Sequence, residues 1–205
     1  GVVSTGKYFA PKLVATLKTV FPEIKVELVV GNREQTIAAF DAREVDLAIM
    51  GRPPRMPPNI SEPIGPHPHV LIAPPHHRLS GKPRIDPREI MQEPFIAREE
   101  GSGTRILMSR FLDRIGEGGD YDVTTMSSNE TIKQAVMAGL GLALISQHTV
   151  VEELHAGRLV ALDLPGLPIE RSWYLLWRSD LPLGPAAERI RAHVSAMGGS
   201  FLPAV

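Results

Sequence analysis

The sequence DLAIM at residues 46–50 is an almost continuous apolar run, which is typical of a parallel strand that is buried on both faces. Two strand–helix pairs precede it. A strand at residues 2–4 leads into an amphipathic helix that stops at Pro22, and a strand at residues 26–30 leads into a helix at residues 33–42. The order strand–helix–strand–helix–strand predicts the start of a doubly wound α/β fold.

The second half of the chain repeats this order after an irregular, proline-rich stretch at residues 51–69. The composition shift there favours a boundary between two lobes. We expect the last strand and helix to return to the first lobe, with two extended crossings near residues 70–74 and 170–174. This assigns residues 1–71 and 173–205 to lobe I and residues 72–172 to lobe II. Ligands of such folds bind at the carboxyl ends of the strands.

Composition and charge exclude several classes of protein. The 205 residues are 43% hydrophobic and 22% charged, as in ordinary globular proteins, and the net charge of −1 provides no basic field for nucleic acid. The absence of cysteine excludes disulfides, thiolate metal sites and cysteine nucleophiles. No apolar run approaches the ~20 residues of a membrane span, and the first residues do not resemble a secretory signal. We expect a cytoplasmic protein without membrane contact, of which this sequence is a fragment.

Three strand-to-helix turns are rich in glycine and hydroxyl groups: Ser4 to Gly6, Gly101 to Arg105 and Ser127 to Glu130. The first turn of a helix has N–H groups without partners and a partial positive charge, so it can bind a carboxylate or phosphate without a basic patch. In the second turn, Gly101 and Gly103 allow close approach of the backbone, Ser102 and Thr104 add hydroxyls, and Arg105 adds a fixed charge. We therefore predict that this turn binds an anion.

Simpler explanations exist for the same residues. Serine and threonine are preferred N-caps whatever the function, and Ser127 with Glu130 matches the Ser-x-x-Glu capping box. Arg98 is open to two interpretations, as a donor to a ligand or as the partner of Glu99 or Glu100 on a solvated rim.

Catalysis and metal binding are not indicated. His67 and His69 have a conceivable metal-ligand spacing, but prolines crowd the cluster that they form with His76 and His77, and no carboxylate lies at a matching offset. No nucleophile elbow, P-loop or dinucleotide fingerprint is present. We expect no enzyme activity, no metal and no cofactor.

Several segments resemble the effector-binding domain of LysR-type transcriptional regulators: STGKYFAPKL, FPEIKVELVVGNREQTIAAF, EVDLAIMGRPP, PPHHRL and SSNETIKQAVMAGLGLALIS. The resemblance covers essentially the whole chain. Within that family, IAREEGSGTR and STGKYFAP are similar to the CbbR branch, whose members control carbon-fixation (RuBisCO) operons. His77-Arg78-Leu79 departs from the family's usual His-Pro-Leu, which affects only a loop.

The resemblance implies two Rossmann-like lobes of the periplasmic-binding-protein type, joined by two extended crossover strands, with a small molecule bound between them. The family's ligand contacts fall by position on Ser4, Thr5, Arg52, Ser102 to Arg105 and Asn129. With Gly101 and Arg98 from the glycine-rich segment, the candidate ligand-binding residues are Ser4, Thr5, Arg52, Arg98, Gly101, Ser102, Gly103, Thr104, Arg105 and Asn129.

The function implied is a switch rather than catalysis. The resemblance suggests a small anionic effector, such as a sugar phosphate, a phosphorylated acid or a reduced nicotinamide nucleotide. It also suggests a homodimer or homotetramer that contacts DNA only through an amino-terminal winged helix-turn-helix domain, which this sequence lacks. The alternative is a solute-binding protein of a transport system, which would share the fold but act as a monomer.

Overall fold

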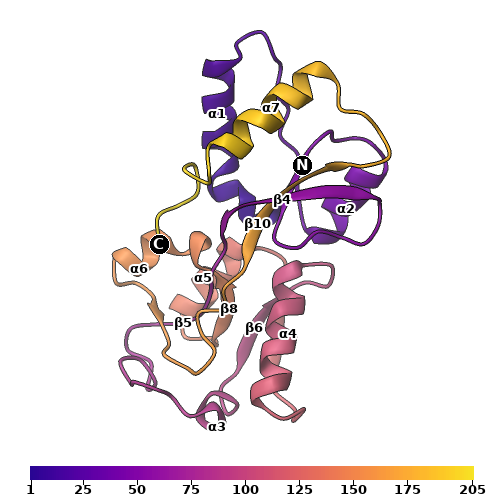
Figure 1. Cartoon of the computed structure of the whole chain (residues 1–205). Coiled ribbons are helices and arrows are strands. Elements are labelled where there is room, and N and C mark those ends of the chain that lie inside the picture. The colour runs from indigo at the N-terminus through magenta and orange to yellow at the C-terminus, as the bar shows by residue number, and fades with distance from the viewer. The chain divides into compact units, whose positions relative to one another are not determined.

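The computed structural model describes residues 1–205, which divide into two α/β units (Figure 1). Unit 1 contains Gly1–His67 and Arg171–Ala204, and unit 2 contains Pro68–Glu170 together with Val205. Each unit has a central sheet with helices on both of its faces. The α/β class and the two Rossmann-like lobes expected from the sequence are therefore present.

Unit 1 is built on a five-stranded sheet with the order β2-β1-β3-β10-β4. Three strands at one side are parallel: β1 (Val2–Val3), β2 (Val30–Gly31) and β3 (Ala48–Met50). Antiparallel pairing then joins β3 to β10 (Ser172–Arg178), and β10 to β4 (Asn59–Pro66). The strand near the end of the chain thus completes the first sheet, as the sequence predicts.

Alternation along β10 divides the core of unit 1 into two layers. Trp173 and Leu175 face one layer, whereas Leu176 faces the other. On the first face, the Phe9 and Trp173 rings meet edge to face with centroids 5.0 Å apart. The first layer is covered by α1 (Ala10–Val20) and α7 (Pro185–Ala196), and the second by α2 (Arg33–Asp41).

Unit 2 combines an antiparallel sheet with a parallel strand pair. The sheet has the order β8-β5-β9, formed by β8 (Ala143–Ser146), β5 (His69–Ala73) and β9 (Val160–Ala161). The parallel pair is β6 (Phe95–Arg98) and β7 (Val123–Met126). A parallel bridge between Phe95 and Leu142 connects the two parts into one layer.

The helices of unit 2 also pack on both faces. Met108, Phe111 and Leu112 form one apolar stripe, and Ile132, Ala135 and Val136 form another on the opposite side of the strands. The first stripe belongs to α4 (Gly103–Ile115), which shares its face with the short α3 (Pro87–Ile90). The second belongs to α5 (Asn129–Met137), beside α6 (Val151–His155).

Several expectations about local structure are wrong. The strand expected at residues 26–30 is confined to Val30–Gly31. The proline-rich stretch contains the eight-residue strand β4. It lies at the edge of its sheet, where the missing N–H groups of Pro63 and Pro66 need not break the pairing. The turn at Ser4 does not open α1: it forms a 3-10 helix (Ser4–Tyr8), and α1 begins at Ala10.

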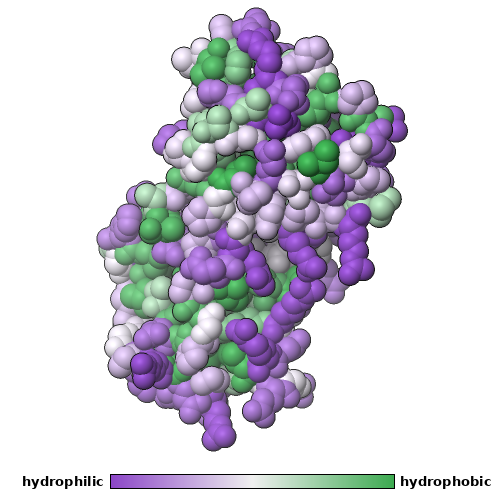
Figure 2. Space-filling model, in the orientation of Figure 1, coloured by the Kyte–Doolittle hydropathy of each residue, from purple (hydrophilic) through white to green (hydrophobic).

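The visible face of the molecule is largely hydrophilic, with hydrophobic residues in separate patches (Figure 2). Large apolar side chains are exposed at Val20, Val29, Val30, Met56, Ile60, Ile106, Leu140 and Val205. None of the helices combines the length and the apolar character needed to cross a membrane.

Gly139 and Gly141 have different structural roles, which substitution can separate. Gly139 ends α5 with a left-handed φ of 80°, and a Cβ there would meet no atom within 4 Å. A Cβ on Gly141 would lie 2.7 Å from the Pro94 carbonyl oxygen. We expect Gly139→Ala to lower the free energy of unfolding by about 1 kcal/mol and Gly141→Ala by about 3 kcal/mol in urea denaturation. Asparagine should be tolerated at position 139 but not at 141, and equal costs would contradict this assignment.

His148, which is buried in the 3-10 helix Gln147–Thr149 after β8, makes the stability of unit 2 depend on pH. Burial lowers the pKa of His148 from 6.5 to about 4. Between these values the unfolded chain binds a proton that the folded chain does not. Stability is therefore full above pH 6.5 and falls by roughly 3 kcal/mol as the pH is lowered to 4.

Urea denaturation at several pH values tests this dependence. His148→Gln should flatten the profile in that window, whereas the same change at the exposed His155 should leave it unaltered. A wild-type profile that is already flat between pH 6.5 and 4 would contradict it.

Candidate functional site

The carboxyl ends of β6 and β7 bring together several of the predicted ligand residues in unit 2. Arg105 in α4 donates from Nη1 to the Arg98 carbonyl at 3.2 Å and to Thr125 Oγ1 at 3.0 Å. Asn129 at the start of α5 accepts a hydrogen bond from Arg98. Both helix starts therefore meet the last residue of β6. We call this group the β6–β7 edge: Arg98, Gly101, Ser102, Arg105, Thr125 and Asn129.

Arg98 is buried and neutralised. Its side chain is 4% exposed, and the guanidinium donates to the Glu99 carboxylate through Nε at 2.8 Å and Nη2 at 2.8 Å. Nη1 donates to Asn129 Oδ1 at 2.6 Å. Of the two interpretations left open by the sequence, pairing with Glu99 is present, but the pair is not on a solvated rim. Arg98 holds the Asn129 amide in one orientation.

The Asn129 amide has a donor without a partner. The residue is 2% exposed, its Oδ1 is occupied by Arg98, and its Nδ2 has no hydrogen-bond acceptor. An unsatisfied buried donor costs about 1–3 kcal/mol, so such groups need an explanation. The N–H groups of Nδ2 are suited to an oxygen atom supplied by a ligand.

The turn before α4 keeps its donors available as well. Gly101 has φ 83°, a conformation that favours glycine. Ser102 is the N-cap of α4 and is 3% exposed, yet its side chain makes no capping hydrogen bond. Ser102 therefore does not cap the helix through its side chain, which was the simpler explanation of this residue. Gly103 is exposed and Thr104 is half-buried.

The capping box predicted for Ser127 and Glu130 is wrong. The helix begins one residue later than expected, at Asn129, so Ser128 is the N-cap and accepts from the Thr131 N–H at 3.4 Å. Glu130 instead lies 3.2 Å from Lys133 Nζ, one turn further along α5.

Unit 1 has its own edge, at the carboxyl ends of the parallel strands β1, β2 and β3. Ser4 and Thr5 follow β1, but the Ser4 hydroxyl donates to the Gly31 carbonyl at 3.1 Å and Thr5 is buried. The start of α2 is closed by a capping box between Asn32 and Gln35. Side-chain hydroxyls and helix N–H groups are thus less available here than at the β6–β7 edge.

Two arginines supply the remaining donors of this edge. Arg33, the first residue of α2, is half-buried and donates from Nη1 to the Arg52 carbonyl at 2.5 Å. Arg52, which follows β3, is exposed. Burial and the positive charge of Arg52 lower the pKa of Arg33. Arg52 is among the residues predicted from the sequence and Arg33 is not, although the place of Arg33 in a strand-to-helix turn is a usable signal.

The predicted ligand residues therefore form two groups. Ser4, Thr5 and Arg52 belong to unit 1, and the other seven belong to unit 2. That one ligand contacts both groups stays a prediction.

A cavity of about 330 Å³ in unit 1 contains none of these residues. It is lined by apolar side chains of α1 and α7, the segment at residues 24–29 and the sheet. Its charged lining includes the exposed Lys25–Glu27 pair, but none of the buried side-chain atoms without a hydrogen-bond partner lies in it, so the chemistry favours the strand ends.

Comparisons with known proteins agree on one family. The family model described as "LysR substrate binding domain" matches residues 1–198. The HTH-type transcriptional regulator CbbR of Cereibacter sphaeroides is 54% identical over 203 residues, which cover 99% of this chain and 66% of that protein. The RuBisCO operon transcriptional regulator of Allochromatium vinosum is 43% identical over 193 residues, covering 94% of this chain and 64% of that protein. The chain thus spans about two thirds of the length of these relatives.

A solved structure matches the fold closely. The CcmR regulatory domain from Synechocystis PCC6803, in complex with 2-PG, superposes with a TM-score of 0.88 at 34% identity. The match covers 96% of this chain and 94% of that one. Because the family model extends over nearly every residue and the fold agrees, the chain belongs to the family of LysR substrate-binding domains.

Proposed function

We propose that this chain is the effector-binding domain of a CbbR-like transcriptional regulator, which senses a small phosphorylated metabolite and controls carbon-fixation genes. The 2-PG bound by the CcmR domain, 2-phosphoglycolate, is the first candidate effector. In this proposal the regulator is a homodimer or homotetramer in the cytoplasm, and it contacts DNA through a part of the protein outside this chain. A solute-binding protein of a transport system is not favoured, because the similar proteins are transcriptional regulators.

The observation that carries the proposal is the unsatisfied amide of Asn129 at the β6–β7 edge. Around it, the starts of α4 and α5 present backbone N–H groups, and the Ser102 hydroxyl is not used as a cap. Arg105 contributes a positive charge and forms no ion pair with a carboxylate. Three kinds of donor suit the three terminal oxygens of a phosphate group.

Binding of a phosphate at the β6–β7 edge would change which conformation of the regulator is preferred. A bound phosphate would satisfy donors on α4 and α5 at once and so favour the arrangement in which both helix starts are aimed at it. A ligand shifts an equilibrium only through its different affinity for the two states. The effector would therefore act by stabilising one conformation of the regulator rather than through any chemical step.

Asn129→Asp tests the amide with almost no change of shape. The aspartate keeps an oxygen for Arg98 but replaces the free donor by a negative charge. At 100 times its dissociation constant, 2-phosphoglycolate should stabilise the wild type by about 2.7 kcal/mol in thermal denaturation. Asn129→Asp should abolish this gain.

Gln134→Glu is the matched control, because it adds the same charge on an exposed position of α5. It should keep the gain. Retention of full stabilisation by Asn129→Asp would rule out the amide as a phosphate donor.

Arg105 is tested by calorimetric titration with the same ligand. Loss of a charge-assisted hydrogen bond predicts that Arg105→Met weakens binding by about 10- to 100-fold. The unliganded protein should also lose about 1–2 kcal/mol, since Arg105 bonds to Arg98 and Thr125.

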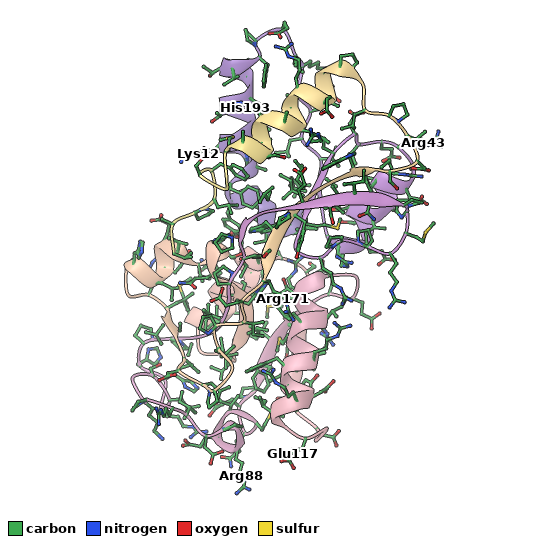
Figure 3. The ribbon with its side chains drawn as sticks, viewed as in Figure 1. Lys12, Arg43, Arg88, Glu117, Arg171 and His193 are labelled. Atoms are coloured by element: carbon green, nitrogen blue, oxygen red, sulfur yellow. The ribbon has the colours of Figure 1, made fainter.

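Arg88→Met provides the control. Arg88 in α3 and Glu117 lie at the end of unit 2 where α4 stops, away from its start (Figure 3). This variant should bind like the wild type, and equal affinities for the Arg105 and Arg88 variants would contradict the assigned role.

A further inference from the structure

Several arginines of this chain bind a carboxylate through the same edge of the guanidinium, the one formed by Nε and Nη2. Three pairs have this geometry, with each nitrogen donating to a different oxygen: Arg98 with Glu99, Arg178 with Asp180, and Arg191 with Glu188. The planar guanidinium aims these two N–H groups in parallel, which matches two oxygens held on one atom. We call the Nε and Nη2 side of a guanidinium its fork edge.

Arg105 is held by the opposite side of its guanidinium. Both of its hydrogen bonds start from Nη1, which donates to the Arg98 carbonyl at 3.2 Å and to Thr125 Oγ1 at 3.0 Å. Nη1 carries two N–H groups, so these two acceptors use both of them. The fork edge of Arg105 has no hydrogen bond or ion pair with any group of the chain.

The two acceptors come from neighbouring positions on β6 and β7. Ala97 pairs with Thr125 in the parallel register, and Arg98 pairs with Met126, so the Arg98 carbonyl and the Thr125 side chain lie at the same end of the strand pair. Threonine is restricted at χ1 because it is β-branched, which makes its hydroxyl a well-placed acceptor. Because the fork edge lies opposite Nη1, it faces away from both of these acceptors.

We propose that Thr125 is a positioning residue for the effector: with the Arg98 carbonyl, it holds Arg105 so that the fork edge binds two oxygens of one phosphate group. This inference rests on the proposed function, since the phosphate is that of the same ligand at the β6–β7 edge. Arg105 then acts through two parallel hydrogen bonds rather than as a point charge. A guanidinium that is fixed before binding loses little conformational entropy when the ligand arrives.

Substitutions at Thr125 test the positioning by calorimetric titration with 2-phosphoglycolate. Thr125→Val keeps the β-branched shape but removes the acceptor, and it should weaken binding by about 3- to 10-fold, as expected for one hydrogen bond. Thr125→Ser returns the hydroxyl and should recover most of the affinity. Thr124→Val is the matched control, because Thr124 is also exposed on β7 but its side chain points to the other face of the strand. It should bind like the wild type.

Arg105→Lys separates the fork from the charge. Lysine keeps the positive charge but has no planar fork, so this variant should bind 2-phosphoglycolate about 10-fold more weakly than the wild type.

Nuclear magnetic resonance adds a measurement that a purely stabilising role of Thr125 would not change. The Nε–H signal of Arg105 is assigned by its absence in Arg105→Lys. On addition of 2-phosphoglycolate or inorganic phosphate to the wild type, this signal should shift and its exchange with water should slow. In Thr125→Val the shift at saturation should be smaller.

The outcomes separate this inference from the proposed function. If Thr125→Val binds 2-phosphoglycolate as tightly as Thr124→Val does, the positioning role of Thr125 is overturned and the phosphate site stands. If Arg105→Lys binds like the wild type, or if the Arg105 Nε–H signal ignores a ligand that does bind, the fork geometry is overturned. If the wild type binds neither 2-phosphoglycolate nor phosphate, the effector site itself is wrong, and the inference that rests on it fails with it.

Discussion

The buried guanidinium of Arg98 imposes the constraint on which the β6–β7 edge depends. A cation that is withdrawn from water needs both a counter-charge and hydrogen-bond acceptors. Glu99, the next residue in the chain, supplies the negative charge. Asn129, at the start of α5, supplies an oxygen that accepts a hydrogen bond. The backbone oxygen of Arg98 in turn receives Arg105 from the start of α4. One residue at the end of a strand thereby fixes the positions of two helix starts.

This arrangement links a requirement of folding to the proposed recognition of the effector. Satisfying the charge of Arg98 occupies one side of the Asn129 amide and leaves the other side, Nδ2, aimed away with no partner. Removing either member of a buried ion pair costs about 3–5 kcal/mol of folding free energy. The Arg98–Glu99 pair therefore stabilises the orientation of the Asn129 amide. The donor is rigid before any ligand arrives, and a rigid donor loses little conformational entropy on binding.

The architecture could be predicted from the sequence because its signals are local. The apolar run at residues 46–50 and the helical spacing of apolar residues correspond to β3 and the helices of the structure. The strand β4 could not be predicted, since its prolines argue against a strand until its position at the sheet edge is known. The start of α5 could be predicted only to within one residue, because Ser127 and Ser128 are both favourable N-caps and the structure uses Ser128.

The candidate site is predicted from the sequence only as a set of turns, without their electrostatics. Glycine and hydroxyl content predicts donors in the turn before α4, which lies beside Arg105. That this turn binds a ligand stays a prediction. Sequence alone could not tell that Arg98 is buried or that Arg33 lacks a carboxylate, because both depend on which side chains from other segments come near. Whether a charged side chain has an ionic partner is decided by the folded structure.

The difference in origin of the donors on the two edges has an evolutionary consequence. Peptide N–H groups at the starts of α4 and α5 are present whatever side chains are encoded, whereas the Asn129 amide and the Arg105 guanidinium depend on their codons. The guanidinium groups at positions 33 and 52 can each be removed or replaced by a single codon change. Related domains with the same backbone can therefore differ in the side-chain donors at these two edges while they keep the peptide donors of the helix starts.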